Sequence, residues 1–163
     1  MTMIHLTIQT PVAPERVLGA LTDFSPRRLD LWSNIDPRSY VVHAVRATSA
    51  DVTEGSAFFG GVWERAHYDW SHPELLTITV QESNAFAAGS SWTYRITPAE
   101  DGGSRINFSL HRVRKNLKGY VLTTLLRVFG RRIFQQDLEQ TLKRLAEVSS
   151  ASGGSSEEQP AGT

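Results

Sequence analysis

The last long stretch of the chain, from Asn116 to Val148, constrains the fold most, because it contains no proline and has helical character throughout. At roughly 1.5 Å per residue it would form a rod about 45 Å long, longer than a small domain is wide. Its second half carries one apolar stripe with spacings of four, four and three, formed by Phe134, Leu138, Leu142 and Leu145. We therefore expect this half to pack on one side against a broad surface such as a sheet.

The first half of this stretch has apolar residues around most of its circumference, so we expect it to be buried more completely. Gly130 lies at the junction, where glycine inside a helix costs roughly 1 kcal/mol, which predicts a kink or a close backbone approach. Arg127, Arg131 and Arg132 interrupt the apolar run. A transmembrane helix needs about 20 mostly apolar residues, so we expect no membrane insertion.

The rest of the chain begins with an alternating strand, Met3–Ile8, followed by two short helices at Glu15–Phe24 and Arg27–Asn34. From Tyr40 onward the apolar period is two, and turn signals separate about six consecutive extended segments. The predicted strands are Tyr40–Thr48, Ser56–Gly61, Val62–Ser71, Leu75–Glu82, Phe86–Thr97 and Arg105–Val113, with a turn at Glu54–Gly55.

Consecutive strands joined by tight turns form an antiparallel sheet, and the long helix then lies across one face of it. This order predicts an α+β helix-grip fold, in which a curved antiparallel β-sheet wraps around a long C-terminal α-helix and two short helices follow the first strand. Incomplete contact between sheet and helix would leave a cavity. We expect one domain over residues 1–148 and a disordered tail at 149–163, which lacks apolar periodicity.

Composition excludes several classes of protein. Seventeen basic and seventeen acidic residues cancel, so the overall charge indicates neither nucleic acid nor a membrane as partner. The absence of cysteine excludes disulfides, thiolate metal sites and a cysteine nucleophile. The segment Met1–Gln9 alternates and does not resemble a signal peptide. We therefore expect a cytoplasmic monomer or homodimer that binds no nucleic acid.

The order of elements, with Val12–Val17 leading into Ala20–Phe24, resembles the START/Bet v 1-like (SRPBCC) superfamily, and most of all its bacterial polyketide cyclase/dehydrase branch. Trp63–Ser71 followed by Glu82–Asn84 looks like a subgroup of small actinobacterial members. The resemblance covers about residues 3–148 and implies a hydrophobic cavity between sheet and helix. It implies no particular catalytic residue, because the superfamily includes ligand carriers, cyclases, hydrolases and co-chaperones without a shared catalytic motif.

One local group could carry chemistry. His67 and Asp69 share a face of a predicted strand and His72 follows in the turn, a set that would suit a non-haem iron or zinc ion. Alternatively, His67 could be a general base oriented by Asp69, with Arg65 on the same face as a further catalytic candidate. A third interpretation is a pair on the solvent side of the sheet. We expect no metal and no cofactor.

A second group consists mostly of aromatic residues that could line an apolar ligand pocket or simply fill the core. The candidate ligand-binding residues are Trp32, Trp63, Tyr68, Trp70, Asn84, Trp92, Tyr94, Phe108, Tyr120 and Leu125. The face of strand 62–71 stays open, because a shift of one residue exchanges its two sides. One side would give the cavity Arg65 and His67, and the other would give it Glu64, Tyr68 and Trp70.

The third feature is a basic stretch without any acidic residue between Asp101 and Asp137. It could receive an anionic ligand, a partner or a lipid headgroup. The interpretation that we favour is a solvated rim paired with acids such as Asp23, Asp30 and Asp36. The basic residues are Arg105, Arg112, Arg114, Lys115, Lys118, Arg127, Arg131 and Arg132.

Three functions follow from these features. The first hypothesis is a binder of a hydrophobic small molecule, such as a lipid, a polyketide-like compound or an aromatic metabolite. The second is an aromatase/cyclase-type enzyme that assists an aldol condensation and water loss, which requires a titratable group with a perturbed pKa inside the cavity. The third is a protein-interaction module, which could combine a filled core with an exposed apolar patch.

Overall fold

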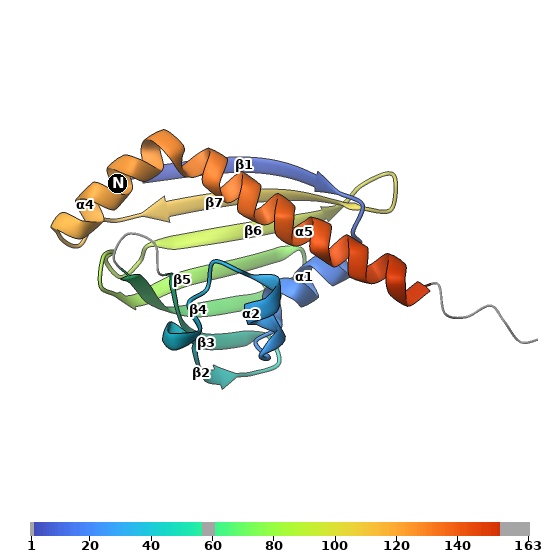
Figure 1. Cartoon of the computed structure of the whole chain (residues 1–163), viewed down its shortest axis with the longest axis horizontal. Helices are drawn as coiled ribbons and strands as arrows, with labels where there is room; N and C mark the ends of the chain where they lie inside the picture. The colour runs from blue at the N-terminus through green and yellow to red at the C-terminus, as the bar shows by residue number, and fades with distance from the viewer. Residues whose placement is uncertain (1, 57–60, 154–163) are drawn as a thin grey trace, which may run out of the picture.

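The computed structural model of the chain describes residues 2–56 and 61–153, with side chains described up to Val148. One antiparallel sheet in the order β1-β7-β6-β5-β4-β3-β2 forms the main layer (Figure 1). Its strands are β1 (Thr2–Thr10), β2 (Val41–Val45), β3 (Ser49–Ser56), β4 (Val62–His72), β5 (Leu75–Ser83), β6 (Ser91–Pro98) and β7 (Ser104–Arg112). The helices are α1 (Pro14–Thr22), α2 (Arg27–Leu31), the 3-10 turn η1 (Pro37–Ser39), α4 (Leu117–Leu125), the π-helical turn η2 (Leu126–Gly130) and α5 (Arg131–Gly153).

The predicted helix-grip fold is confirmed. The sheet curves around one rod formed by α4, η2 and α5, while α1 and α2 follow the first strand and α2 lies beside α5 (Figure 1). Every pair of neighbouring strands is antiparallel, as expected for strands joined by short turns. No helix within residues 2–56 and 61–153 is long and apolar enough to cross a membrane.

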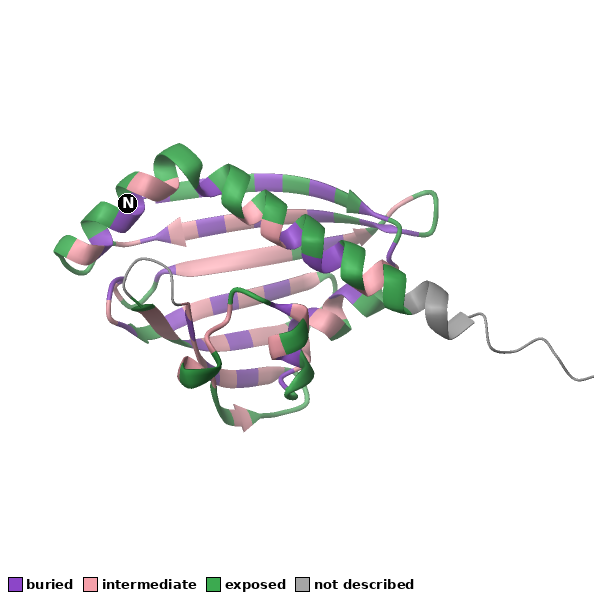
Figure 2. Ribbon diagram, viewed as in Figure 1, coloured by how far each residue is buried: buried purple, intermediate pink, exposed green. Residues whose placement is uncertain are grey.

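The core forms between the inner face of the sheet and α5. Burial alternates at every residue of β1, so its even-numbered residues face the helix (Figure 2). Ile8 of β1 pairs with Ile106 of β7, and both belong to the same buried cluster as Leu138 and Leu142 of α5. The other side of this half of α5 is exposed, which confirms that it packs on one side only.

The first half of the long helix was expected to be the more buried half, and that expectation is wrong. Leu122 packs on Ala85 and Phe86, but much of the remaining apolar surface of α4 and η2 faces solvent (Figure 2). The physical reason is that the Ala85–Phe86 segment and the start of β1 support only one side of this half.

Gly130 makes the close approach that its position predicted. The helix passes through the π-helical turn η2 at this point, and a Cβ on Gly130 would lie 2.6 Å from Ile4 Cδ1 of β1. A Cβ at this position would require the end of the Ile4 side chain to shift, so glycine lets the helix lie directly against β1.

Several predicted boundaries are wrong. The second short helix ends at Leu31, and Glu54–Gly55 is part of β3 where a turn was expected. Gly55 is required for packing, because a Cβ there would lie 2.5 Å from the Cβ of Ser39. The turn between β2 and β3 is instead at residues 46–49, where the Arg46 N–H donates to the Ser49 carbonyl over 2.8 Å.

Two other strand predictions differ from the structure. The predicted strand at 56–61 falls mostly on residues 57–60, outside the described residues, and Ser56 ends β3. β6 begins at Ser91 and not at Phe86, because the chain turns at Gly89, whose φ is +86°. Helix α5 continues to Gly153, past the predicted domain boundary at 148, and residues 154–163 of the predicted tail lie outside the described residues.

Candidate functional site

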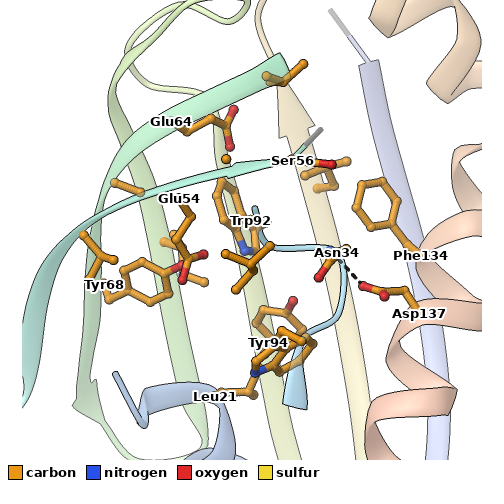
Figure 3. Close-up of a pocket in the computed structure, with 18 of the residues that line it drawn as sticks. Leu21, Asn34, Glu54, Ser56, Glu64, Tyr68, Trp92, Tyr94, Phe134 and Asp137 are labelled. Carbon is orange, nitrogen blue, oxygen red and sulfur yellow. Dashed lines mark hydrogen bonds between the residues drawn. The ribbon is translucent and has the colours of Figure 1, made fainter. Parts of the chain in front are cut away.

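A cavity of about 240 Å³ lies between the inner face of the sheet and α5 (Figure 3). The central strands supply one wall, α5 supplies the opposite wall, and the end of α2 closes one side. Its lining includes Trp92 and Tyr94 of β6, Phe108 and Leu110 of β7, Phe134 and Asp137 of α5, and Trp32 after α2. The wall is therefore mostly aromatic and aliphatic, as in pockets for small organic molecules.

The orientation of β4, which the sequence left open, is now defined. Glu64, Ala66 and Tyr68 line the cavity, whereas Arg65 and His67 lie on the opposite face of the strand. The register confirms this assignment, because Ala66 is paired with Val52 of β3, another residue of the cavity wall.

One polar cluster lies at the α2 end of the cavity. The guanidinium of Arg28 donates to the carboxylate of Glu54 and to the carbonyl of Leu21, the latter over 3.0 Å. The hydroxyl of Tyr68 donates to the same carboxylate over 2.9 Å and accepts from Arg28 Nη2 over 3.3 Å. The guanidinium also lies 4.8 Å from the centre of the Phe24 ring. This buried cation is thus fixed by both hydrogen bonds and aromatic contacts.

A second charged pair lies at another part of the wall. Arg112 of β7 donates two hydrogen bonds to Glu64 of β4, of 2.8 and 3.0 Å, and the two side chains are only 9% and 12% exposed. The guanidinium lies 4.5 Å from the Trp92 ring centre and 4.7 Å from that of Phe86. Burial raises the pKa of Glu64 above its ordinary value, and Arg112 offsets part of that effect.

Several hydrogen-bond donors of the wall lack acceptors within the described part of the chain. The buried Nε1 of Trp32 and Nε of Arg112 have no partner. The indole N–H of Trp92 and the hydroxyl of Tyr94 also have none, and both rings project from β6 toward the cavity (Figure 3). Burial raises the pKa of Tyr94, so its hydroxyl keeps the proton that it can donate. The unused polar groups therefore favour a ligand with an acceptor oxygen.

The rim of the cavity is bridged by one hydrogen bond. Asn34 Nδ2, in the loop after α2, donates to Asp137 Oδ2 of α5 over 3.1 Å (Figure 3). Asn34 is exposed and Asp137 is half-buried, and burial raises the pKa of the Asp137 carboxyl. The contact joins two elements that border the same cavity.

The predicted ligand-binding residues fall into two groups. Those that line the cavity are Trp32, Tyr68, Trp92, Tyr94 and Phe108. Trp70 faces inward but packs behind the cavity against Phe24, with 6.2 Å between ring centres, and Trp63 lies on the outer face of β4. Tyr120 and Leu125 belong to α4 and are not part of the wall. The Asn84 side chain bonds to backbone atoms of Gly61 and Trp63.

The predicted catalytic and metal candidates lie on the outer face of the sheet. His67 Nδ1 is 2.7 Å from Asp51 Oδ1, so His67 pairs with β3 and not with Asp69. Asp69 accepts a hydrogen bond from the Ser71 N–H, and His72 is exposed at the end of β4. Arg65, on this face too, is exposed. Among residues 2–56 and 61–153, no group of three or more His, Asp or Glu side chains is placed to hold a metal ion.

The sequence analysis missed several polar residues of the cavity wall. Arg112, assigned to a solvated rim, lies on the inward side of β7 together with Phe108 and Leu110, and this alternation could have identified it. Glu54 lies two residues after Val52, on the same inward side of β3. The turn predicted at Glu54–Gly55 hid this alternation. Arg28 had no comparable signal, because its helix is too short to show periodicity.

Comparisons with known proteins agree with this architecture. The chain matches the family described as polyketide cyclase / dehydrase and lipid transport over residues 1–149. The structure is similar to that of the ZhuI aromatase/cyclase from Streptomyces sp. R1128, with 13% identity, a TM-score of 0.78, and coverage of 94% of this chain and 98% of that one. A comparison with curated proteins finds no match.

Two other solved structures share the fold. TTHA0849 from Thermus thermophilus is 16% identical, with a TM-score of 0.74 and coverage of 91% of this chain and 99% of that one. A START superfamily protein from Mycobacterium smegmatis is 12% identical, with a TM-score of 0.70 and coverage of 90% and 98%. At these identities the structures establish the fold, and the family match covers nearly the whole chain. The protein therefore belongs to the polyketide cyclase / dehydrase and lipid transport family, and its fold is that of START/Bet v 1-like (SRPBCC) proteins.

Proposed function

We propose that this protein binds a compact, mostly apolar small molecule that carries an acceptor oxygen, in the cavity between the sheet and α5. Family and fold support a role in binding a hydrophobic ligand or in polyketide cyclisation. The geometry of the cavity supports an aromatic or polyketide-like metabolite as the ligand.

The size of the cavity favours a compact ligand. Its volume of about 240 Å³ is below the range of roughly 300–1,000 Å³ typical of drug-sized ligands. A dry cavity of about 150 Å³ is enough to bind benzene. One or two fused rings therefore match the available space better than a long acyl chain does.

The single observation that carries the proposal is the pair of unpaired donors on β6. Trp92 and Tyr94 are two residues apart, so their side chains project from the same face of the strand into the cavity. Neither the indole N–H nor the hydroxyl has an acceptor within the described residues. Both donors are available to the cavity, and a hydrogen bond from either one to a ligand carbonyl or phenolate would contribute about 0.5–1.5 kcal/mol.

Native mass spectrometry of the purified protein, followed by extraction of any retained compound, tests the proposal. We expect an aromatic or polyketide-like molecule to be retained, or a small aromatic ketone to bind when added. Ala66→Phe would fill the cavity from β4 and abolish binding, whereas Arg65→Phe on the opposite face is the matched control and would retain it. Equal binding by both variants would place the ligand elsewhere and contradict the proposal.

A second candidate is an aromatase/cyclase-type enzyme, because the cavity contains titratable groups with perturbed pKa values. Burial raises the pKa of Glu64 above 4.5, the direction expected of a general acid, while Tyr94 keeps its proton and could hold the ligand carbonyl by a hydrogen bond during ring closure and loss of water. Incubation with a short poly-ketone, with detection of an aromatic product by mass spectrometry, tests this function. Conversion by the wild type that Tyr94→Phe abolishes would favour the enzyme over a carrier.

A further inference from the structure

The N-terminal half of the long helix carries a row of exposed, large apolar side chains. They extend from the start of α4 through η2 into the first turn of α5, and we call this surface the docking face. Its members are Leu117, Tyr120, Val121, Val128, Phe129 and Ile133, which are 46% to 80% exposed. Exposed apolar residues scattered singly are ordinary, but such a row along one helix indicates an unpartnered surface.

Basic side chains flank the docking face. Arg127, Arg131 and Arg132 are exposed, and no ion pair among the described residues involves them. Arg114 is also exposed and lies 5.0 Å from the centre of the Tyr120 ring. The chain has no acidic residue between Asp101 and Asp137, so nothing on this helix before Asp137 neutralises the charge. The rim pairing with Asp23, Asp30 and Asp36 that we favoured from the sequence is not observed for these arginines.

We propose that the docking face binds the surface of an anionic lipid membrane. A helix that exposes aliphatic and aromatic side chains beside arginines has the composition of helices that lie in the membrane interface. Its apolar side chains would enter the boundary between headgroups and acyl chains, while Arg127, Arg131 and Arg132 contact lipid phosphates. Each basic residue near an anionic surface contributes about 1 kcal/mol.

The distribution of charge argues against a second copy of the chain as occupant. A two-fold interface places the same patch of both subunits together, so it would bring six arginines of the two docking faces close to one another, and the docking face supplies no carboxylate to pair with them. An acidic protein is the other occupant that this charge could attract, and in that case the folded protein would fail to bind anionic vesicles in the experiment below.

Docking on this face has a consequence for the cavity. Leu122, on the buried side of α4, packs on Phe86, and Phe86 in turn lines the cavity and contacts Arg112. A membrane bound to α4 would therefore lie nearer to the Arg112–Glu64 part of the cavity than to its α2 end. The docking proposal itself does not depend on which molecule the cavity binds.

Vesicle flotation of the full chain, without added ligand, tests the proposal. We expect the protein to bind vesicles made of equal parts phosphatidylglycerol and phosphatidylcholine, and to bind vesicles of phosphatidylcholine alone only weakly. Added salt should weaken the binding to the anionic vesicles. The triple variant Arg127→Gln/Arg131→Gln/Arg132→Gln should reduce partitioning by roughly 100-fold, at about 1 kcal/mol for each charge. The double variant Val128→Ser/Phe129→Ser should reduce binding to both kinds of vesicle.

Matched controls lie on other surfaces. Arg16, Arg95 and Arg105 are exposed and away from the docking face, so their replacement by glutamine removes the same charge without effect on binding. Val45→Ser on β2 is the control for apolar removal, and circular dichroism would show that all variants are folded. Failure of the folded wild type to bind anionic vesicles would overturn the proposal. So would a dimer in sedimentation experiments that Val128→Ser/Phe129→Ser dissociates, because the docking face would then be an interface between copies.

Discussion

The two faces of β4 present similar chemical groups in opposite environments. On the inner face, Glu64 pairs with Arg112, and their side chains are 12% and 9% exposed. On the outer face, His67 pairs with Asp51 of β3, which also binds Arg46, and these basic side chains are 38% and 57% exposed. Glu64 and His67, three residues apart in one strand, therefore belong to one charged pair away from water and one in contact with it.

This contrast shows why residue type alone does not identify the face of β4 that meets a ligand. His67 and Asp69 are residue types common in active sites, but on the outer face solvent screens both of them. His67 is already paired with Asp51, and the Asp69 carboxylate already accepts a hydrogen bond from the Ser71 N–H. Glu64 and Tyr68 lie on the desolvated inner face, where a charge or proton acts strongly on a ligand. Environment, more than residue type, distinguishes the two faces.

The largest expected difference is in stability. Arg112→Met would leave Glu64 buried without its cation, and removal of one partner of a buried pair costs about 3–5 kcal/mol. Arg46→Met on the outer face should change the free energy of unfolding by no more than about 1 kcal/mol. Urea unfolding measures both. Losses of equal size would contradict the proposed contrast between the faces.

A smaller effect is expected at the α2 end of the cavity. Tyr68→Phe removes the hydroxyl that donates to Glu54, and the loss of a hydrogen bond to a buried charged group should cost about 1–3 kcal/mol. Tyr120→Phe, which removes a hydroxyl from an exposed ring, should leave the urea midpoint unchanged. A Tyr68→Phe protein as stable as the wild type would show that Arg28 alone satisfies the carboxylate.

The two faces should also respond to pH in opposite directions. Burial raises the pKa of Glu64 above its ordinary value of 4.5, so its contribution to stability is present below pH 4.5 and is lost as pH rises through the folded pKa. Hydrogen bonds from His67 and Arg46 lower the pKa of Asp51 below 3.8, so its contribution is present above pH 3.8 and is lost as pH falls through the folded pKa.

Carboxyl-carbon NMR titration measures both folded pKa values, and unfolding experiments across pH measure the linkage. Glu64→Gln should remove a decline in stability with rising pH in the window just above 4.5. Asp51→Asn should remove a decline with falling pH below 3.8. A Glu64 pKa at or below its ordinary value would mean that Arg112 outweighs burial, and the sign of the first effect would reverse.

Much of the fold was accessible from periodicity, and the limits have physical causes. Strand alternation and the stripe through Leu138 and Leu142 defined the sheet and its contact with α5. Alternation divides β4 into two faces, but only tertiary packing decides which of them meets the helix. Apolar residues around α4 indicated burial, yet the structure leaves much of that helix uncovered. Cytoplasmic location, oligomeric state and the lack of a nucleic-acid partner stay predictions from composition.

The proposed function depends most on Tyr94, whose hydroxyl we expect to donate to an acceptor oxygen of a compact aromatic ligand. Calorimetric titration with 1-tetralone and with tetralin, which lacks the carbonyl, tests it most directly. We expect the wild type to prefer 1-tetralone by about 0.5–1.5 kcal/mol, the net contribution of one hydrogen bond, and Tyr94→Phe to remove most of this preference. Trp63→Phe on the outer face of β4 should retain it in full. A preference that survives Tyr94→Phe unchanged, or the binding of neither compound by the wild type, would contradict the account.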